Sequence, residues 1–126
     1  MTKNEQVQYL ANIYFLLLAD GQVERIEGRV FESIDHEIGA GYFERRNALE
    51  LAQQADFKVS PVGRLSERLR NLEDLLFAAY CNGVVDMAEK KLIVEFATKI
   101  AVNQQQFGVM KTEAKQRHTE FGENVR

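Results

Sequence analysis

The octapeptide Asp20-Gly21-Gln22-Val23-Glu24-Arg25-Ile26-Glu27 has a related copy later in the chain, Asn82-Gly83-Val84-Val85-Asp86-Met87-Ala88-Glu89. Shifting the sequence by 62 positions pairs residues 10–39 with residues 72–101 without a gap. Identical pairs include Leu10 with Leu72, Phe15 with Phe77 and Ile38 with Ile100. The repeat predicts two pseudo-symmetric helix–loop–helix halves.

Apolar residues around both copies recur with the period of an α-helix, and no strand pattern is present. The spacing predicts about six helices, over residues 3–19, 24–38, 42–55, 61–81, 86–102 and 103–117. Residues 13–19 and 75–81 are apolar on every side, which predicts two buried helices that pack against each other at the centre. We therefore expect an all-α helical bundle.

Two helix starts carry recognisable cap signals. Ser60 and Pro61 fit the N-cap and the first helical position of the fourth helix. Asn103 and Gln106 fit a reciprocal cap at the start of the sixth helix. Both signals favour helices that begin at defined residues.

The chain length indicates a single domain. With 126 residues, the chain can form one hydrophobic core but not two. We expect this domain over residues 1–118, with repeat halves at 5–55 and 60–117. Residues 119–126 contain few groups that could anchor them, so they are predicted to be a frayed C-terminal tail.

The charge and the apolar runs limit the classes of partner. A formal net charge of −3 at pH 7 argues against nucleic acid. The longest apolar runs, Ile13–Ala19 and Leu75–Cys81, are too short to span a bilayer, and the first residues lack the pattern of a signal peptide. We therefore expect a cytoplasmic protein with no transmembrane segment, linked to a membrane only through a partner.

Each copy of the repeat gathers acidic or amide side chains around its glycine. The six candidates are Asp20, Glu24, Glu27, Asn82, Asp86 and Glu89. An EF-hand calcium loop is rejected, because its first two ligand positions would fall on Leu16 and Leu18. A weaker site for Ca²⁺ or Mg²⁺ is one interpretation, since hard cations prefer oxygen ligands. The other is turn and cap chemistry, with Asp86 and Glu89 forming a capping box.

The pattern Ala-Asp-Gly-x-Val-x-x-x-Glu at residues 19–27 is repeated in modified form at residues 81–89. It resembles the TerB-like family of bacterial tellurite-resistance proteins. It is also similar to the TerB-like N-terminal region of certain membrane-anchored DnaJ-type co-chaperones. The resemblance covers residues 5–117, and it implies an all-helical domain with internal pseudo-symmetry and no established catalytic activity.

The resemblance also implies a set of ligands for divalent cations. The matching positions in this chain are Asp20, Glu24, Glu27, Asp86 and Glu89. The sequence departs from the family pattern at Asn82, where the second copy would usually carry an aspartate. The missing charge lowers the metal affinity expected of the second loop. The cofactor prediction is limited to Ca²⁺, Mg²⁺ or another divalent cation.

Residue types that commonly carry catalysis lack partners at the required spacing. Neither His36 nor His118 has a histidine or cysteine nearby in sequence that would complete a zinc site. Cys81, the only cysteine, ends an apolar helix, which predicts a buried small residue rather than a reactive thiol. We therefore do not expect an enzyme.

Tyr42 and Phe43 follow a glycine pair and are candidate surface anchors for a partner protein or a homodimer.

Together these features predict a non-enzymatic TerB-like helical domain. It would act by protein interaction in a bacterial stress-response or membrane-associated assembly, with a weak divalent-cation site at its acidic loops as an open question. The alternative is a divalent-cation-binding sensor. A metal-dependent hydrolase comes third, because no general base or nucleophile can be named.

Overall fold

The computed structural model of the chain describes residues 1–20, 23–81 and 85–125. It contains six α-helices and a short 3₁₀-helix, η1, and the described residues form no strand. The elements are α1 (Lys3–Leu17), η1 (Leu18–Asp20), α2 (Arg25–Glu37), α3 (Tyr42–Ala52), α4 (Leu65–Tyr80), α5 (Met87–Lys99) and α6 (Gln104–Val125). The predicted all-α fold is confirmed.

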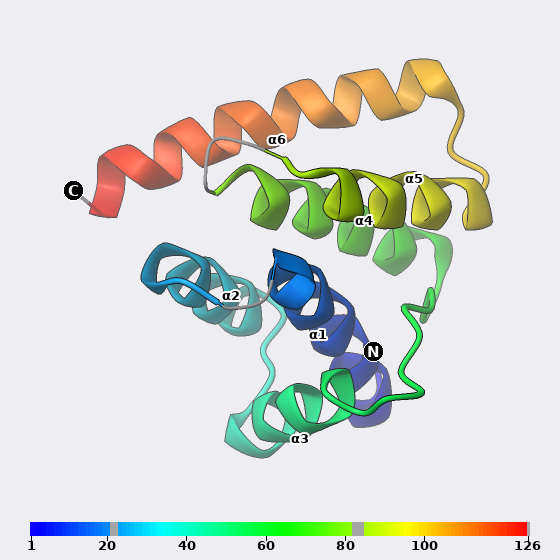
Figure 1. Cartoon of the computed structure of the whole chain (residues 1–126). Helices are drawn as coiled ribbons and strands as arrows, with labels where there is room; N and C mark the ends of the chain where they lie inside the picture. The colour runs from blue at the N-terminus through cyan, green and yellow to red at the C-terminus, as the bar shows by residue number, and fades with distance from the viewer. Residues whose placement is uncertain (21–22, 82–84, 126) are drawn as a thin grey trace.

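The helices that contain the two long apolar runs, α1 and α4, pack against each other at the centre of the molecule (Figure 1). Leu10, Ile13 and Leu16 of α1 are fully buried, as are Leu72 and Leu75 of α4. The remaining helices cover this pair. In Figure 1, α6 lies on one side of α4 and α5, while α1 and α2 lie on the other side, with α3 beyond α1. The predicted central pair is therefore confirmed.

The two halves of the chain have matching neighbours. In the first half, α1 contacts both α2 and α3, and in the second half α4 contacts both α5 and α6. This is the arrangement expected if the repeat in the sequence reflects a two-fold relation in space. The relation itself stays a prediction.

Helices at both ends of the chain begin with a reciprocal cap. At α1, the Glu5 N–H donates to Thr2 Oγ1 at 3.1 Å, and the Thr2 N–H donates to Glu5 Oε1 at 2.8 Å. At α6, the Gln106 N–H donates to Asn103 Oδ1 at 2.8 Å, and the Asn103 N–H donates to Gln106 Oε1 at 3.0 Å. The predicted cap of the sixth helix is confirmed, and each such cap is worth about 1 kcal/mol.

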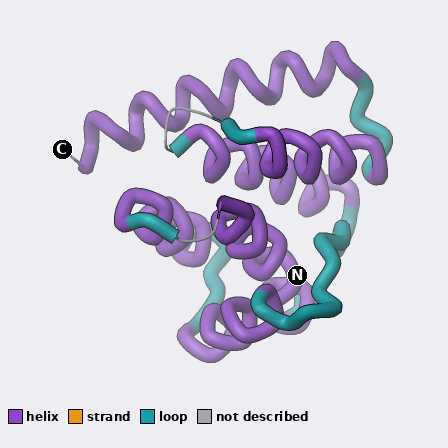
Figure 2. Tube along the Cα trace, viewed as in Figure 1, coloured by secondary structure: helices purple, strands orange, loops and turns teal. Residues whose placement is uncertain are grey.

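The prediction that Ser60 and Pro61 begin the fourth helix is wrong, because α4 begins at Leu65. Residues 53–64, which we call the strap, instead run as a loop from α3 to α4 (Figure 2). Ser60 is fixed by a tertiary contact: its N–H donates to Asn12 Oδ1 at 3.1 Å, and its carbonyl accepts from Asn12 Nδ2 at 2.8 Å. Gly63 then adopts a positive φ of 76°, which ends the strap before the helix starts.

The last helix is longer than predicted. It continues through the segment expected to be a frayed tail and ends at Val125. A contact explains the extension, because the Phe121 ring packs edge-to-face on the Phe77 ring of α4 with centroids 5.5 Å apart.

Among the described residues, no helix combines the length and the apolar character needed to cross a bilayer.

Candidate functional site

Three acidic residues of the repeated loops, Glu27, Asp86 and Glu89, act as helix caps. Glu27 and Glu89 are buried, with 1% and 5% of their surface exposed. Glu27 Oε1 accepts from the Glu24 N–H at 3.0 Å, and Glu89 Oε1 accepts from the Asp86 N–H at 3.3 Å. At α5 the box is complete, because the Glu89 N–H also donates to Asp86 Oδ1 at 2.8 Å. The predicted capping box is confirmed, and α2 contains the equivalent glutamate contact.

A metal centre needs more ligands than the described loop residues bring together. Within residues 1–20, 23–81 and 85–125, no group of three or more His, Cys, Asp or Glu side chains is placed to hold an ion. Glu27 and Glu89 each use an oxygen on the backbone of their own loop. The side chain of Asp20 and the whole of Asn82 lie outside the described part. The cation site therefore stays a prediction.

A buried polar network, which sequence reasoning missed, joins α1 to α4. The Tyr9 hydroxyl donates to Asp74 Oδ2, and Asn12 Nδ2 donates to Asn71 Oδ1 at 2.8 Å. All four residues have at most 1% of their surface exposed. The 62-residue offset of the repeat pairs Tyr9 with Asn71 and Asn12 with Asp74. The Tyr9–Asp74 bond and the Asn12–Asn71 bond therefore join equivalent positions of the two halves. The repeat offset was the only sequence signal that could have paired these positions.

Arg117 extends this network to the last helix. Its Nη1 contacts Asp74 Oδ1 at 2.6 Å, and its Nη2 contacts Glu37 Oε2 at the end of α2 at 2.7 Å. The guanidinium also lies over the Phe77 ring, 4.0 Å from the centroid. One side chain of α6 therefore ties together α2 and α4 by charge-assisted bonds and a cation–π contact.

Burial raises the pKa values of two groups in the network, Asp74 and Tyr9. It raises the pKa of Asp74, although the hydrogen bonds from Tyr9 and Arg117 act in the opposite direction. Burial, followed by the adjacent Asp74 charge, raises the pKa of the Tyr9 hydroxyl. Strongly shifted groups often mark active sites. Here both are sealed inside the helix interface and bond to each other, so the arrangement serves as a structural clamp.

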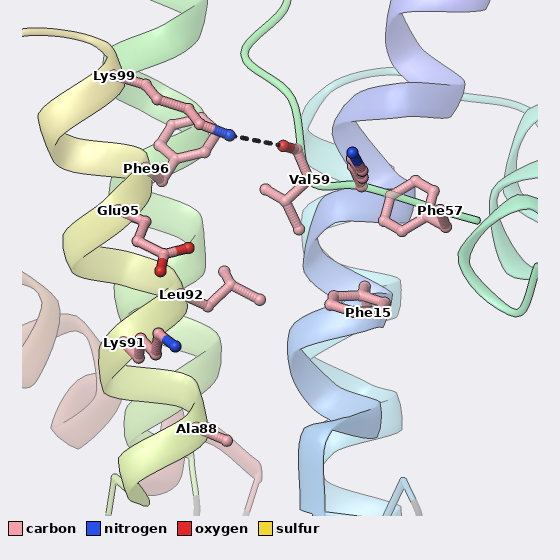
Figure 3. Close-up of a pocket in the computed structure, with 10 residues that line it drawn as sticks. Phe15, Phe57, Val59, Ala88, Lys91, Leu92, Glu95, Phe96 and Lys99 are labelled. Atoms are coloured by element: carbon pink, nitrogen blue, oxygen red, sulfur yellow. Dashed lines mark hydrogen bonds between the residues drawn. The ribbon is translucent and has the colours of Figure 1, made fainter. Parts of the chain in front are cut away.

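A groove opens between α1, α5 and the strap, with a volume of about 430 Å³ (Figure 3). Its walls are apolar: Phe15 of α1 and Leu92 of α5 face one another across it. Phe57 of the strap packs against Phe15 with ring centroids 5.2 Å apart, and buried Phe96 also lines the groove. A pocket of this size and composition is typical of binding sites for small molecules or single side chains.

The rim of the groove is basic. Lys91 and Lys99 come from α5 and Lys58 from the strap, and Glu95 is the acidic lining residue. All four are exposed. The Lys99 ammonium donates to the Val59 carbonyl at 3.5 Å, across the mouth of the groove. Sequence reasoning missed this site because its residues come from three separate segments.

A second hollow of about 220 Å³ lies between α4, α5 and α6. Three lysines line it, and two of them contact aromatic rings. Lys111 lies 5.3 Å from the Phe107 centroid, and Lys115 lies 5.5 Å from the Tyr80 centroid. These lysines therefore already cover the apolar wall of this hollow.

The predicted surface anchors are exposed. Tyr42 and Phe43, at the start of α3, have 62% and 69% of their surface exposed. Their rings contact each other edge-to-face with centroids 5.5 Å apart. The two histidines and the cysteine differ in exposure. His36 is exposed, His118 is half-buried on α6, and Cys81 is buried as predicted.

Comparison with known proteins adds no relative to this picture. Neither the protein-family models, nor the curated proteins, nor the solved structures contain a match to this chain. The similarity to the TerB-like family therefore rests on the two acidic loops at residues 19–27 and 81–89 alone.

Proposed function

We propose that this chain is a non-enzymatic, TerB-like interaction domain that binds other proteins in a bacterial stress-response or membrane-associated assembly. The observation that carries the proposal is the exposed aromatic pair Tyr42 and Phe43. Aromatic side chains dominate the energetics of protein interfaces, and they are uncommon as paired, uncovered groups on a monomer surface.

The aromatic pair is well placed to receive a partner. It lies on the first turn of α3, which packs closely on the central helix α1. The two rings also restrict each other, through their edge-to-face contact. A rigid, pre-ordered anchor loses little conformational entropy on binding. This favours Tyr42 and Phe43 as the centre of an interface.

The buried network also favours binding over catalysis. Burial raises the pKa values of Tyr9 and Asp74, yet each is the hydrogen-bond partner of the other inside the core. A general acid or base must reach a substrate proton to within hydrogen-bonding distance. With at most 1% of their surface exposed, these two groups offer no such access.

The test uses a photo-crosslinking amino acid at Phe43, with exposed Gln116 of α6 as the matched control position. In extract of the source organism, we expect a discrete cross-linked protein from position 43 that is absent from position 116. With that protein purified, Phe43→Ser should weaken binding by about 30-fold, the loss typical of an interface hot spot.

Three outcomes would change the proposal. A cross-link between two copies of this chain would identify the homodimer contact instead of a foreign partner. Identical products from positions 43 and 116, or unchanged binding by Phe43→Ser, would overturn the role of the aromatic pair.

A further inference from the structure

We infer that the groove between α1, α5 and the strap receives an acidic segment of a partner protein, with one large apolar side chain inserted between Phe15 and Leu92. The inference rests on the proposed function, that the domain binds proteins, and it adds the chemistry of the partner. Three independent features of the groove carry it: its apolar walls, its basic rim and its fixed shape.

The walls select an apolar side chain. Phe15 and Leu92 are half-buried and face one another from opposite helices, so each leaves apolar surface directed into the gap (Figure 3). Phe57 and Phe96 extend this apolar lining. A volume of about 430 Å³ is large enough to hold one aromatic or leucine side chain with its flanking backbone.

The rim selects acidic neighbours for that side chain. Three lysines and one glutamate give the rim a net charge of +2, on a chain whose formal net charge is −3. Among the described residues, none of Lys58, Lys91 and Lys99 forms an ion pair within 4.0 Å of a carboxylate. Their ammonium groups can therefore contact carboxylates of a partner, which speeds association and sets its orientation.

The groove is held open by the core. The strap forms one wall, and it is fixed by the paired hydrogen bonds between Ser60 and the buried Asn12 amide. Gln8 Nε2 adds a longer bond to the Lys58 carbonyl at 3.4 Å. A pre-formed site requires little ordering when a ligand enters. The shape therefore favours a specific ligand over general charge attraction.

The concave shape also favours a peptide over a lipid surface. A bilayer contacts side chains that protrude, whereas Phe15 and Leu92 lie in the walls of a groove between two helices. Met87, with 81% of its surface exposed, is the most exposed large apolar side chain of α5 among the described residues, and it lies outside the groove. Anionic vesicles are therefore a direct competitor to include in the test.

The probe is a fluorescent 12-residue peptide with a central Phe flanked on both sides by Glu and Asp. Two matched peptides replace the Phe by Ser, or the acidic residues by Lys. In fluorescence anisotropy at about 150 mM salt, where screening acts beyond about 8 Å, we expect the first peptide to bind at least tenfold more tightly than either control.

Three variants of the full chain locate the binding site. Ala88→Trp adds bulk at an exposed position that lines the groove, and Lys91→Glu reverses a rim charge. Each should weaken binding of the first peptide by about tenfold or more. Lys90→Glu is the matched control, since it makes the same charge change on the other flank of α5, where it lines the second hollow. We expect it to change affinity by less than about threefold. Thermal melts establish that all three variants are folded.

Several results would overturn the inference. Equal binding of the three peptides would mean that neither the Phe nor the acidic residues are recognised. Equal losses in Lys91→Glu and Lys90→Glu would mean charge attraction without a groove. Binding to vesicles of phosphatidylcholine and phosphatidylglycerol, without binding to the peptides, would identify a lipid surface. If the peptides do not bind but a partner cross-links at position 43, the groove is not the binding site, and the proposed interaction function stands. Failure of both would remove the interaction function itself.

Discussion

The two halves of the molecule place polar groups at equivalent positions but satisfy them differently. In the first half, Asn12 is neutral and its amide bonds to Asn71 and to the backbone of Ser60. In the second half, the equivalent Asp74 carries an ionisable carboxyl group and is bonded by Tyr9 and Arg117. Positions related by the 62-residue offset therefore both form a central polar contact, but with different chemistry. One side is closed by the strap and the other by α6.

The largest expected effect comes from removing the charge partner in the second half. Arg117→Ala leaves Asp74 buried without its counter-ion, which typically costs 3–5 kcal/mol. Because 31% of the Arg117 side chain is exposed, we expect the lower end, about 3 kcal/mol, in urea unfolding. Gln116→Ala, on the exposed face of α6, should stay within about 0.5 kcal/mol. Equal stability of Arg117→Ala and wild type would show that Asp74 is already neutral in the folded protein.

The corresponding change in the first half should cost less. Asn12→Ala removes four hydrogen bonds, to Gln8, Asn71 and both backbone groups of Ser60, but leaves no unpaired charge. We expect a loss of about 2 kcal/mol in the free energy of unfolding. The strap should also become more accessible to protease near Lys58. If Asn12→Ala and Arg117→Ala lowered the free energy of unfolding equally, the two polar contacts would not differ in strength as we expect.

The acidic loops offer a smaller comparison of the same kind. Glu27→Gln and Glu89→Gln should each lower the free energy of unfolding by about 1 kcal/mol, through a weakened cap. Melts of chelator-stripped protein should then respond to Ca²⁺ and Mg²⁺ in the same way for wild type and variants. A saturable rise in Tm with one ion, lost in Glu27→Gln, would instead support the cation-sensor alternative.

The smallest expected difference between the halves is in how the free energy of unfolding depends on pH. The raised pKa of Asp74 means that the folded state binds this proton more tightly than the unfolded state, where an aspartate titrates at about 3.9. Its contribution to stability is therefore present at low pH and declines as the pH rises from about 4 through the folded pKa. The stability of wild type relative to Asp74→Asn should fall over this range. The cost of Asn12→Ala should stay constant, and a rise with pH for Asp74 would contradict its assignment.

Local signals in the sequence predicted much of the fold. The all-apolar segments gave the central helix pair, and the spacing of Asp86 with Glu89 and of Asn103 with Gln106 gave two caps, because these features depend on neighbours in the chain. The start of α4 was missed because Asn12, 48 residues from Ser60, holds Ser60 in the strap. A local N-cap signal is weaker than two tertiary hydrogen bonds.

The candidate sites were harder to predict for the same reason. Glu27 and Glu89 are predicted as candidate ligands of a divalent cation, with helix capping as the other interpretation, and their hydrogen bonds fit the caps. The network around Asp74 was not foreseen, since Arg117 lies 43 residues away and no motif links the two. The groove combines side chains from α1, the strap and α5, so its apolar walls and basic rim exist only in the folded chain.

The network also joins residues that are made at different times during synthesis. Tyr9 emerges from the ribosome 65 residues before its acceptor Asp74, and Asp74 emerges 43 residues before Arg117. Until then, the first three helices contain a buried hydroxyl and amide without their partners, and the fourth contains a carboxylate without its cation. Such groups oppose burial in an apolar interface. We therefore expect the bundle to reach its full stability only after Arg117 of α6 has been made.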